Sequence, residues 1–248
     1  MGPALWSADL DIFATSNPEA VEYLSDLFGF YADLGSHLDM LHESPLCMGI
    51  AWETENVYWV YDGADGRIVR YDFVDDHGVG YDDHSDGIIG RVKGPKLARV
   101  EDVPSHMDID QSTGLLYVAD TGNNRILVLD TATGERGGTL RSVEPGVDHH
   151  ELENVDATKI IDGADIDGME QPSGLEVVDG HLLITDHQTG YILAFALSGE
   201  GVDGADADLV DWVDTGRAGG IMGIDAPSLD EIWFVDAAED ELIRLTAN

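Results

Sequence analysis

The sequence predicts an all-β fold, a β-propeller built from four-stranded blades. Two observations support it: short apolar runs separated by Gly, Asn and Asp turns, and recurrence of that unit along the chain. The clearest copy is PSHMDIDQSTGLLYVADTGNNRILVLDTATG, residues 104–134. It predicts strands at Met107–Ile109, Leu115–Ala119 and Ile126–Leu129. One such unit cannot bury both faces of its sheet, so further copies are required.

Four copies align without a gap from the Asp that closes the second strand to the start of the third. These aspartates are Asp62, Asp120, Asp186 and Asp236. The first strand of each copy begins 12 or 13 residues upstream, at Gly49, Met107, Gly174 and Gly223. These starts are 58, 67 and 49 residues apart. Such spacing suits propeller blades with variable loops better than a helical solenoid.

The same pattern places the remaining strands. The first copy predicts Cys47–Glu53, Val57–Tyr61, Arg67–Phe73 and a hairpin of Ile88–Val92 with Leu97–Val100; the second adds Thr158–Ile161. The third predicts Gly174–Val178, Leu182–Thr185, Tyr191–Leu197 and an outer strand at Leu209–Val213; the fourth predicts Gly223–Ala226, Ile232–Val235 and Leu242–Leu245. No low-complexity linker separates the copies, so we expect one domain over residues 1–248, with four blades in 48–248.

Residues 1–47 do not match the repeat. Asp9–Thr15 alternates in polarity and predicts a strand, which could complete the last blade and close the ring. Asn17 and Pro18 are typical of a helix start. The helix that follows is expected to bury one face, made of Val21, Leu24, Leu27 and Phe28.

The charge is extreme. Twelve Lys and Arg against fifty Asp and Glu give a net charge of −38. Such a surface repels phosphate backbones and anionic membranes, so nucleic acid is not an expected partner. Self-repulsion should destabilise the fold at low salt. Two interpretations stay open: a halophilic or marine solvated surface, or carboxylates that bind Ca²⁺.

The cellular location is left open. The N-terminus MGPALWSADLD has neither a basic n-region nor an apolar h-region. The expectation is a halophilic cytoplasm or, where a signal peptide has been removed, a secreted or periplasmic location. The single Cys47 cannot form an internal disulfide. No window approaches 18 consecutive apolar residues, so no transmembrane segment is expected.

Residues 104–134, with Pro-Ser before the first strand and LYVADTGNNRI after it, resemble the NHL repeat of β-propellers. Residues 46–73 and 172–198 also match, whereas 220–246 match less well because EDE at 239–241 replaces the Gly/Asn–Arg turn. The resemblance covers about two-thirds of the chain. It implies the fold and leaves the function open, because such propellers include enzymes and binding modules.

Six histidines are the candidate metal ligands. Strand parity places the residue before each first strand at one mouth of the channel, giving a ring of Met48, His106, Ser173 and Met222. The segment GSHLDMLHESPLCM is expected to enter at the same mouth, and the insertion at 75–86 to climb back to it before Ile88. The histidines that would then converge are His37, His42, His77, His84, His106 and His187.

The chemistry of this set points to a transition metal. Three imidazoles with water suit catalytic zinc, whereas His with Met and Cys suits copper. The alternative is that the histidines are scattered over the surface, as expected for His149, His150 and His181 in polar loops. Peptidyl-amidoglycolate lyases, which are NHL-like, hold zinc with channel histidines, and the resemblance implies such a role here for His106 alone.

Other signatures are weaker. Asp62 and its three equivalents are expected to accept turn N–H groups rather than to act in catalysis. DGADIDG (162–168) and DGADAD (203–208) resemble calcium loops without the EF-hand spacing. Cys47 with nearby His42 is a weak thiol-nucleophile pair. No nucleophile elbow, P-loop or dinucleotide fingerprint is present in the sequence.

The sequence therefore predicts a metal ion, zinc or copper, at the channel mouth, serving a metal-dependent lyase or hydrolase on a small-molecule or peptide ligand. The alternative is a non-catalytic scaffold that binds a protein or glycan across the same face. A third is an inert module of a larger assembly.

Overall fold

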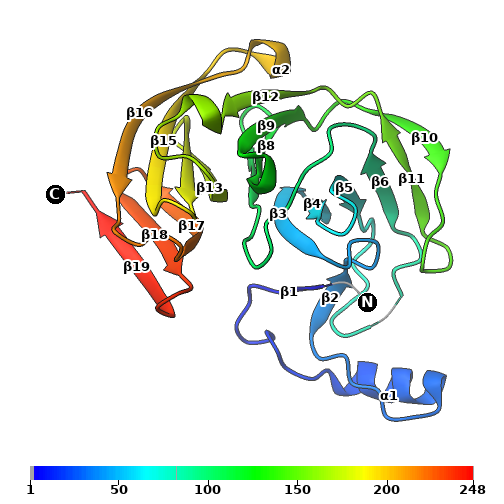
Figure 1. The fold of residues 1–248 in the computed structure, drawn as a ribbon. Helices are drawn as coiled ribbons and strands as arrows, with labels where there is room; N and C mark the ends of the chain where they lie inside the picture. Colours follow the sequence, from blue (N-terminus) through cyan, green and yellow to red (C-terminus); the bar gives the residue numbers. More distant parts are fainter. Residues whose placement is uncertain (1–2, 82, 248) are drawn as a thin grey trace.

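Four sheets follow one another along an arc in the computed structural model, which describes residues 3–81 and 83–247 (Figure 1). The first comprises β3 (Cys47–Thr54), β4 (Val57–Asp62), β5 (Arg67–Asp72) and β6 (Ile88–Val92), extended by β11 (Asp148–Glu153) and β10 (Glu135–Thr139). The second comprises β7 (Met107–Asp110), β8 (Leu115–Asp120), β9 (Arg125–Asp130) and β12 (Ala157–Asp162). The η1 turn (Thr121–Asn123) joins β8 to β9, and η2 (Gly163–Asp165) follows β12.

The third sheet comprises β13 (Pro172–Val178), β14 (His181–Asp186), β15 (Tyr191–Ser198) and β16 (Asp206–Asp214), with the short α2 (Gly201–Gly204) before β16. The last has three strands, β17 (Ile221–Ser228), β18 (Glu231–Asp236) and β19 (Glu241–Thr246). The first strands β3, β7, β13 and β17 contact one another in that order. The first, second and third strands predicted for each of the four copies are thus confirmed, in a propeller-like arrangement.

Apolar side chains fill the spaces between successive sheets. One cluster, with Trp59 and Leu116, lies between the first and second sheets; another, with Phe195, lies between the second and third. A third, with Phe234, joins the third and last sheets. The first sheet's other face packs beneath Leu41 and the segment that precedes β3.

Glycine lies near the start of β3, β13 and β17, and at two of these positions the backbone of a neighbouring segment comes too close for a side chain. A Cβ on Gly49 would collide with the carbonyl oxygen of Ser105, and one on Gly174 would lie 2.5 Å from that of Met222. The predicted ring at the mouth is also linked by hydrogen bonds, since His106 N donates to the Ser173 carbonyl at 2.9 Å. These contacts explain why the repeat register is so regular.

The N-terminal segment differs from its prediction. Asp9–Thr15 forms turns, because Asp9 accepts Asp11 N through its side chain and Phe13 N through its carbonyl. The strand is β1 (Ala4–Trp6), and it pairs with β2 (His37–Met40). Among the described strands β19 pairs with β18 alone, and β1 pairs with β2, so the predicted completion of the last blade by the N-terminal segment was wrong.

The predicted helix is confirmed as α1 (Pro18–Phe28), with Asn17 accepting the N–H groups of Glu19 and Ala20. The predicted buried face was only partly correct. Leu24 is buried, whereas Leu27 is 61% exposed. This helix lies outside the arc, at the end of the molecule that carries β1 and β2 (Figure 1). Among the described residues, no helix has the length and apolar character needed to cross a bilayer.

The predicted hairpin of Ile88–Val92 with Leu97–Val100 also differs. β6 pairs with β5 and, in parallel, with β11, while Leu97–Val100 forms no strand beyond one bridge from Val100 to Val103. Leu97 N instead donates to the carbonyl of Gly66. The segment after β6 therefore crosses to the second sheet without an extra strand.

Candidate metal centre

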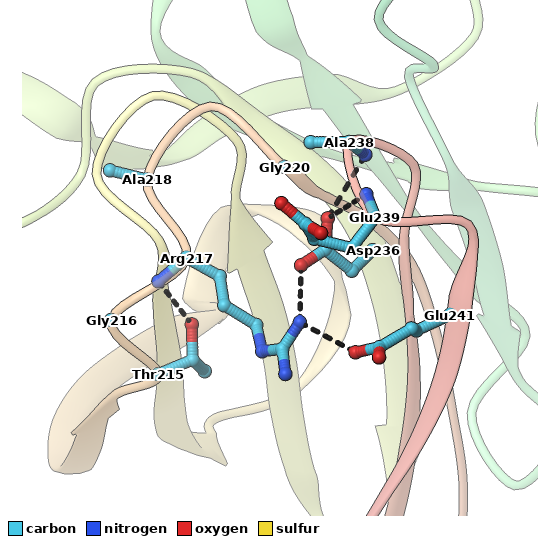
Figure 2. A pocket seen from close by; sticks show the side chains of 9 residues that line it. All are labelled: Thr215, Gly216, Arg217, Ala218, Gly220, Asp236, Ala238, Glu239 and Glu241. Carbon is cyan, nitrogen blue, oxygen red and sulfur yellow. Dashed lines mark hydrogen bonds and ion pairs between the residues drawn. The ribbon is translucent and has the colours of Figure 1, made fainter.

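A hollow of about 510 Å³ lies at the end of the last sheet (Figure 2). Arg217 projects into it and donates to Asp236 at 2.6 Å and to Glu241 at 2.9 Å. Asp236 also accepts Ala238 N, and the Arg217 hydrogen bond lowers the pKa of Asp236. Asp236 is one of the four repeat aspartates, all of them buried. The hollow therefore surrounds a repeat aspartate, and the charge of the Arg217 guanidinium is already balanced by Asp236 and Glu241. We assign no ligand to this hollow.

The prediction that the repeat aspartates accept N–H groups of the turn that follows is confirmed for Asp62, Asp186 and Asp236 and was wrong for Asp120. Asp62 accepts Ala64 N, and Asp186 accepts Thr189 N, in each case within the turn that follows. Asp120 is bonded instead by the side chain of Asn123.

Four of the six candidate histidines gather beside the first sheet. His37 lies in β2, His42 follows it, and His77 and His84 lie in the connection from β5 to β6. The ring centroid of His84 is 5.9 Å from those of His37 and His42 and 5.4 Å from that of His77. His37 and His84 are only 2% and 3% exposed. Together with Asp39 and Glu144, these four form the histidine cluster.

Hydrogen bonds hold one ring nitrogen of His37 and both ring nitrogens of His77. His37 Nδ1 lies 3.0 Å from the carbonyl oxygen of Leu34, and His77 Nε2 lies 2.6 Å from Oδ1 of Asp86. A neutral imidazole that donates from one nitrogen presents a lone pair on the other. His37 Nε2 is buried and has no hydrogen-bond partner among the described residues. Buried polar atoms are normally paired, so this nitrogen marks a position where a ligand is expected.

Asp39 lies beside the other nitrogens of His77 and His84. Its Oδ1 is 3.3 Å from His77 Nδ1 and 4.0 Å from His84 Nε2. The opposite nitrogen of His84, Nδ1, is 3.6 Å from Oε1 of Glu144. Because His37 and Asp39 are two residues apart in β2, their side chains lie on the same face of that strand. Three imidazoles and one carboxylate therefore share a buried site.

The pKa values of the two carboxylates are shifted in opposite directions. Burial raises the pKa of Asp39, and the nearby His84 and His77 offset this only in part. Burial also acts to raise the pKa of Glu144, but hydrogen bonds with His42 and His84 outweigh it and bring the pKa to about 2. Glu144 is therefore an ionised acceptor that orients the His84 ring.

His42 uses both of its ring nitrogens within the cluster. Nδ1 forms an ion pair with Glu144, and Nε2 lies 3.2 Å from the sulfur of Met40. We therefore assign His42 no place among the metal ligands; it positions the carboxylate of Glu144. Glu144 was not predicted from the sequence, because it lies in a turn between β10 and β11, about a hundred residues from His42.

Cys47 is poorly suited to ligate a metal or to act as a nucleophile. Burial, with a further contribution from Asp62, raises the pKa of its thiol to about 11. The thiolate is the reactive and metal-binding form. The thiol instead lies 3.4 Å from the Gly49 carbonyl oxygen, to which it donates.

The expected convergence of six histidines at one mouth was wrong. The ring of His106 lies against Gly223 of β17, and His187 Nδ1 lies 3.1 Å from the Ile221 carbonyl oxygen. Both histidines lie at the end of the sheets where the first strands β7, β13 and β17 start. His77 and His84 lie at the opposite end of the first sheet, where Asp72 pairs with Ile88.

The insertion does not climb back to the mouth, for a topological reason. A connection between two adjacent antiparallel strands begins and ends at the same end of those strands, and β5 and β6 are adjacent and antiparallel. It is the segment from β2 that comes to the insertion, where Gly80 N donates to the His37 carbonyl at 2.8 Å. Asp82, within the insertion at 75–86, lies outside the described residues.

His149 and His150 were expected at the surface and are instead buried, at 5% and 6% exposure. Both belong to β11, which pairs in parallel with β6. His149 Nδ1 is 2.9 Å from the Arg141 carbonyl oxygen. The charged neighbours of these residues made the segment resemble a loop, which hid the strand.

Three carboxylates line neighbouring first strands away from this cluster: Asp108 of β7, Glu176 of β13 and Asp225 of β17. Burial, then the charges of Asp108 and Asp225, raise the pKa of Glu176 to about 8. Above its ordinary pKa of 4.5, the unfolded chain releases the proton that the folded chain keeps. The contribution of Glu176 to stability is therefore full at low pH and falls as the pH rises toward 8.

Glu176→Gln should remove this pH dependence. We expect the variant to be more stable than wild type at pH 8 by about 1 kcal/mol, a value discounted because the side chain is partly solvated. Urea midpoints measured from pH 5 to pH 9 would show a flatter profile. Glu101→Gln, at an exposed position, controls for the loss of one surface charge. Parallel profiles for wild type and Glu176→Gln would contradict the assignment.

Among the described residues, no three His, Cys, Asp or Glu side chains are already arranged around a metal position. The described residues of the two calcium-like stretches, 162–168 and 203–208, likewise form no such arrangement. Asp162 in the first stretch forms an ion pair with Lys159.

No protein-family model matches the chain, and no curated protein matches it. Among solved structures, a Lactobacillus plantarum protein is similar with a TM-score of 0.46 and 9% identity, over 98% of this chain and 64% of that one. This chain therefore spans less than two thirds of that protein.

Two similar structures are of enzymes. The PQQ-bound aldose sugar dehydrogenase of Streptomyces coelicolor has a TM-score of 0.37 and 13% identity, over 82% of this chain and 77% of that one. Virginiamycin B lyase of Staphylococcus aureus has a TM-score of 0.33 and 13% identity, over 81% and 69%. At these values the likenesses carry no argument about function.

Proposed function

We propose that the protein binds one zinc ion between His37, His77, His84 and Asp39, where the N-terminal segment meets the first sheet. The observation that carries this is the buried Nε2 of His37, which has no hydrogen-bond partner among the described residues. A metal ion satisfies such a nitrogen when the other nitrogen donates to a backbone carbonyl, as His37 does to Leu34.

The ring separations suit a single ion. Zinc bonds imidazole nitrogen at about 2.0–2.1 Å, so two rings bound tetrahedrally have centres roughly 5 Å apart. The centroid of His84 is 5.4 Å from that of His77 and 5.9 Å from that of His37. Small side-chain rotations would therefore bring these rings to the metal-bound geometry. Asp39, whose Oδ1 lies 3.3 Å from His77 Nδ1, would supply the fourth ligand.

Zinc fits this donor set better than copper does. Three imidazoles and a carboxylate are common ligands of zinc, whereas thiolate and thioether favour copper in its reduced state. The thiol of Cys47 keeps its proton, with a pKa of about 11, and Met40 lies beside His42 rather than beside the proposed ligands. The outer acceptors, Asp86 and Glu144, would fix the ring orientations.

The bound ion would join segments that are distant in sequence. His37 and Asp39 come from β2, and His77 and His84 from the connection between β5 and β6. Its two positive charges would also offset carboxylate repulsion in a chain with a net charge of −38.

A metal-dependent lyase or hydrolase is the second candidate. It draws support from a groove of about 450 Å³ that reaches His77 from outside. A substrate in that groove would lie next to a proposed metal ligand.

Metal analysis of protein purified without chelator tests the proposal. We expect about one zinc ion per chain, and an affinity at least about 100-fold lower in His84→Ala or His77→Ala, because each loses a ligand. Asp86→Asn, which keeps the ligands but removes an outer acceptor, should weaken binding about 10- to 100-fold. Inductively coupled plasma mass spectrometry and competition with a zinc indicator measure both effects.

Two control variants separate this site from the others. His106→Ala and His181→Ala should keep full zinc content, because His106 lies against Gly223 and His181 Nδ1 contacts only the nearby Asp179 carbonyl among the hydrogen bonds described. Folded wild-type protein that takes up no zinc after incubation with the metal would overturn the proposal. Loss of zinc in His106→Ala alone would move the site to the channel.

A further inference from the structure

The groove beside His77 has walls from two segments. The α1 helix supplies one wall and the connection between β5 and β6 the other, around a space of about 450 Å³. A volume of this size is within the range of small-molecule sites. The groove is lined by Tyr23, Leu24, Leu27, His77, Tyr81 and Asp83.

The walls are aromatic and aliphatic. The rings of Tyr23 and Tyr81 lie 5.7 Å apart, inclined at 54°, and both residues line the groove. Tyr23 is 54% exposed and Leu27 is 61% exposed, whereas Leu24 is buried at 1%. Large apolar side chains left in water on a helix are typical of a surface that binds a ligand.

One charged group defines the polarity of the groove. Asp83 is fully exposed, and Ser85 donates to its Oδ1 through both its hydroxyl and its N–H group. No Lys or Arg is among the described residues that line the groove. With a chain net charge of −38, the groove is complementary to a cation and repels an anion.

We infer that this groove binds a small arylalkylammonium ligand, an aromatic ring joined by a short alkyl chain to a protonated amine. The ring would pack against Tyr23, Tyr81 and Leu27, and the ammonium would face Asp83. Aromatic rings attract both an aromatic guest and a nearby cation. The ligand would lie beside a metal ion only under the proposed function, in which His77 is a zinc ligand. The residues that form the groove are in place without the metal ion.

Titration with two probes of opposite charge tests the inference. Phenethylammonium and 3-phenylpropionate share a ring and a two-carbon linker, so they differ chiefly in the sign of the charge. We expect phenethylammonium to bind with a Kd of about 0.1–1 mM, a value typical of a ligand this small, and phenylpropionate to bind at least tenfold more weakly. Isothermal titration calorimetry or ligand-observed NMR measures both.

Three variants locate the site. Asp83→Asn should weaken phenethylammonium binding about tenfold, and Tyr81→Ala should weaken it by a similar factor through loss of ring contact. Glu22→Gln removes a charge from α1 outside the groove and should leave the affinity unchanged. Circular dichroism spectra and melting temperatures establish that each variant is folded. Equal binding of the two probes, or wild-type affinity in both groove variants, would overturn the inference.

Repeating the titration with and without zinc separates the two proposals. Phenethylammonium binding by chelator-treated protein supports the groove independently of the metal. Protein that binds zinc but no phenethylammonium overturns the ligand inference and leaves the metal site standing. Protein that binds phenethylammonium but never takes up zinc supports the groove and overturns the metal site.

Discussion

Asp120→Ala is expected to lower the free energy of unfolding by about 3–4 kcal/mol, because it breaks a buried charged network. Asp120 is fully buried and accepts the Arg125 guanidinium at 2.7 Å and Ala98 N at 2.8 Å. Its removal leaves that N–H without its acceptor and the guanidinium without its counterion. An orphaned buried donor alone costs about 1–3 kcal/mol. The urea midpoint should fall with little change in the m-value.

Asp130→Ala is the matched control. Asp130 begins the next turn of the same blade and accepts Ala132 N at 2.9 Å in an exposed setting. Loss of that bond should cost about 1 kcal/mol or less, because water replaces the carboxylate. If the two variants lost equal stability, the buried network would not be the reason that the repeat carries this aspartate.

Gly174→Ala is expected to cost about 3 kcal/mol, the upper range for overpacking at a site that cannot relax. A Cβ at this position would lie 2.5 Å from the Met222 carbonyl oxygen and 2.5 Å from Thr185 Oγ1. The first obstacle is the backbone of β17, so relief requires the two first strands to separate. Urea unfolding measures the loss, and near-ultraviolet circular dichroism should report disturbed packing around the aromatic residues.

Gly138→Ala in β10 provides the comparison. The nearest atom to a Cβ there is Glu151 Oε2 at 4.0 Å, so the added methyl group has room. We expect a change within about 0.5 kcal/mol, as at other surface positions. A large loss there, or none at Gly174, would show that backbone contact between first strands is not what requires glycine.

The strands were predictable because their signal is local. Alternation of apolar residues and the turn chemistry of Asp, Asn and Gly act over a few residues, and the repeat presents each pattern four times. The turns of the first and third blades illustrate this, since Asp62 and Asp186 accept N–H groups a few residues ahead of them. Where the pattern was not repeated, as over Asp9–Thr15, alternation alone gave the wrong element.

The candidate metal centre was predictable only in part. The clustered histidines of the sequence did indicate His37, His42, His77 and His84, and these four do meet. Glu144 was missed, because an isolated glutamate in a turn carries no local signal that distinguishes it from other surface carboxylates.

What the sequence by itself determined is the blade: its strands, the aspartate that closes the second strand, and the glycines where neighbouring first strands touch. The tertiary structure alone decided which histidines share a site. His106 is placed by the repeat and stays beside the start of the first strands, whereas His77 and His84 are held at the opposite end of the first sheet because β5 and β6 are antiparallel neighbours. The path of β2 beside that connection, held by the hydrogen bond from Gly80 N to the His37 carbonyl, brings His37 to them. A path of this kind follows from contacts between segments distant in the chain, and periodicity does not encode it.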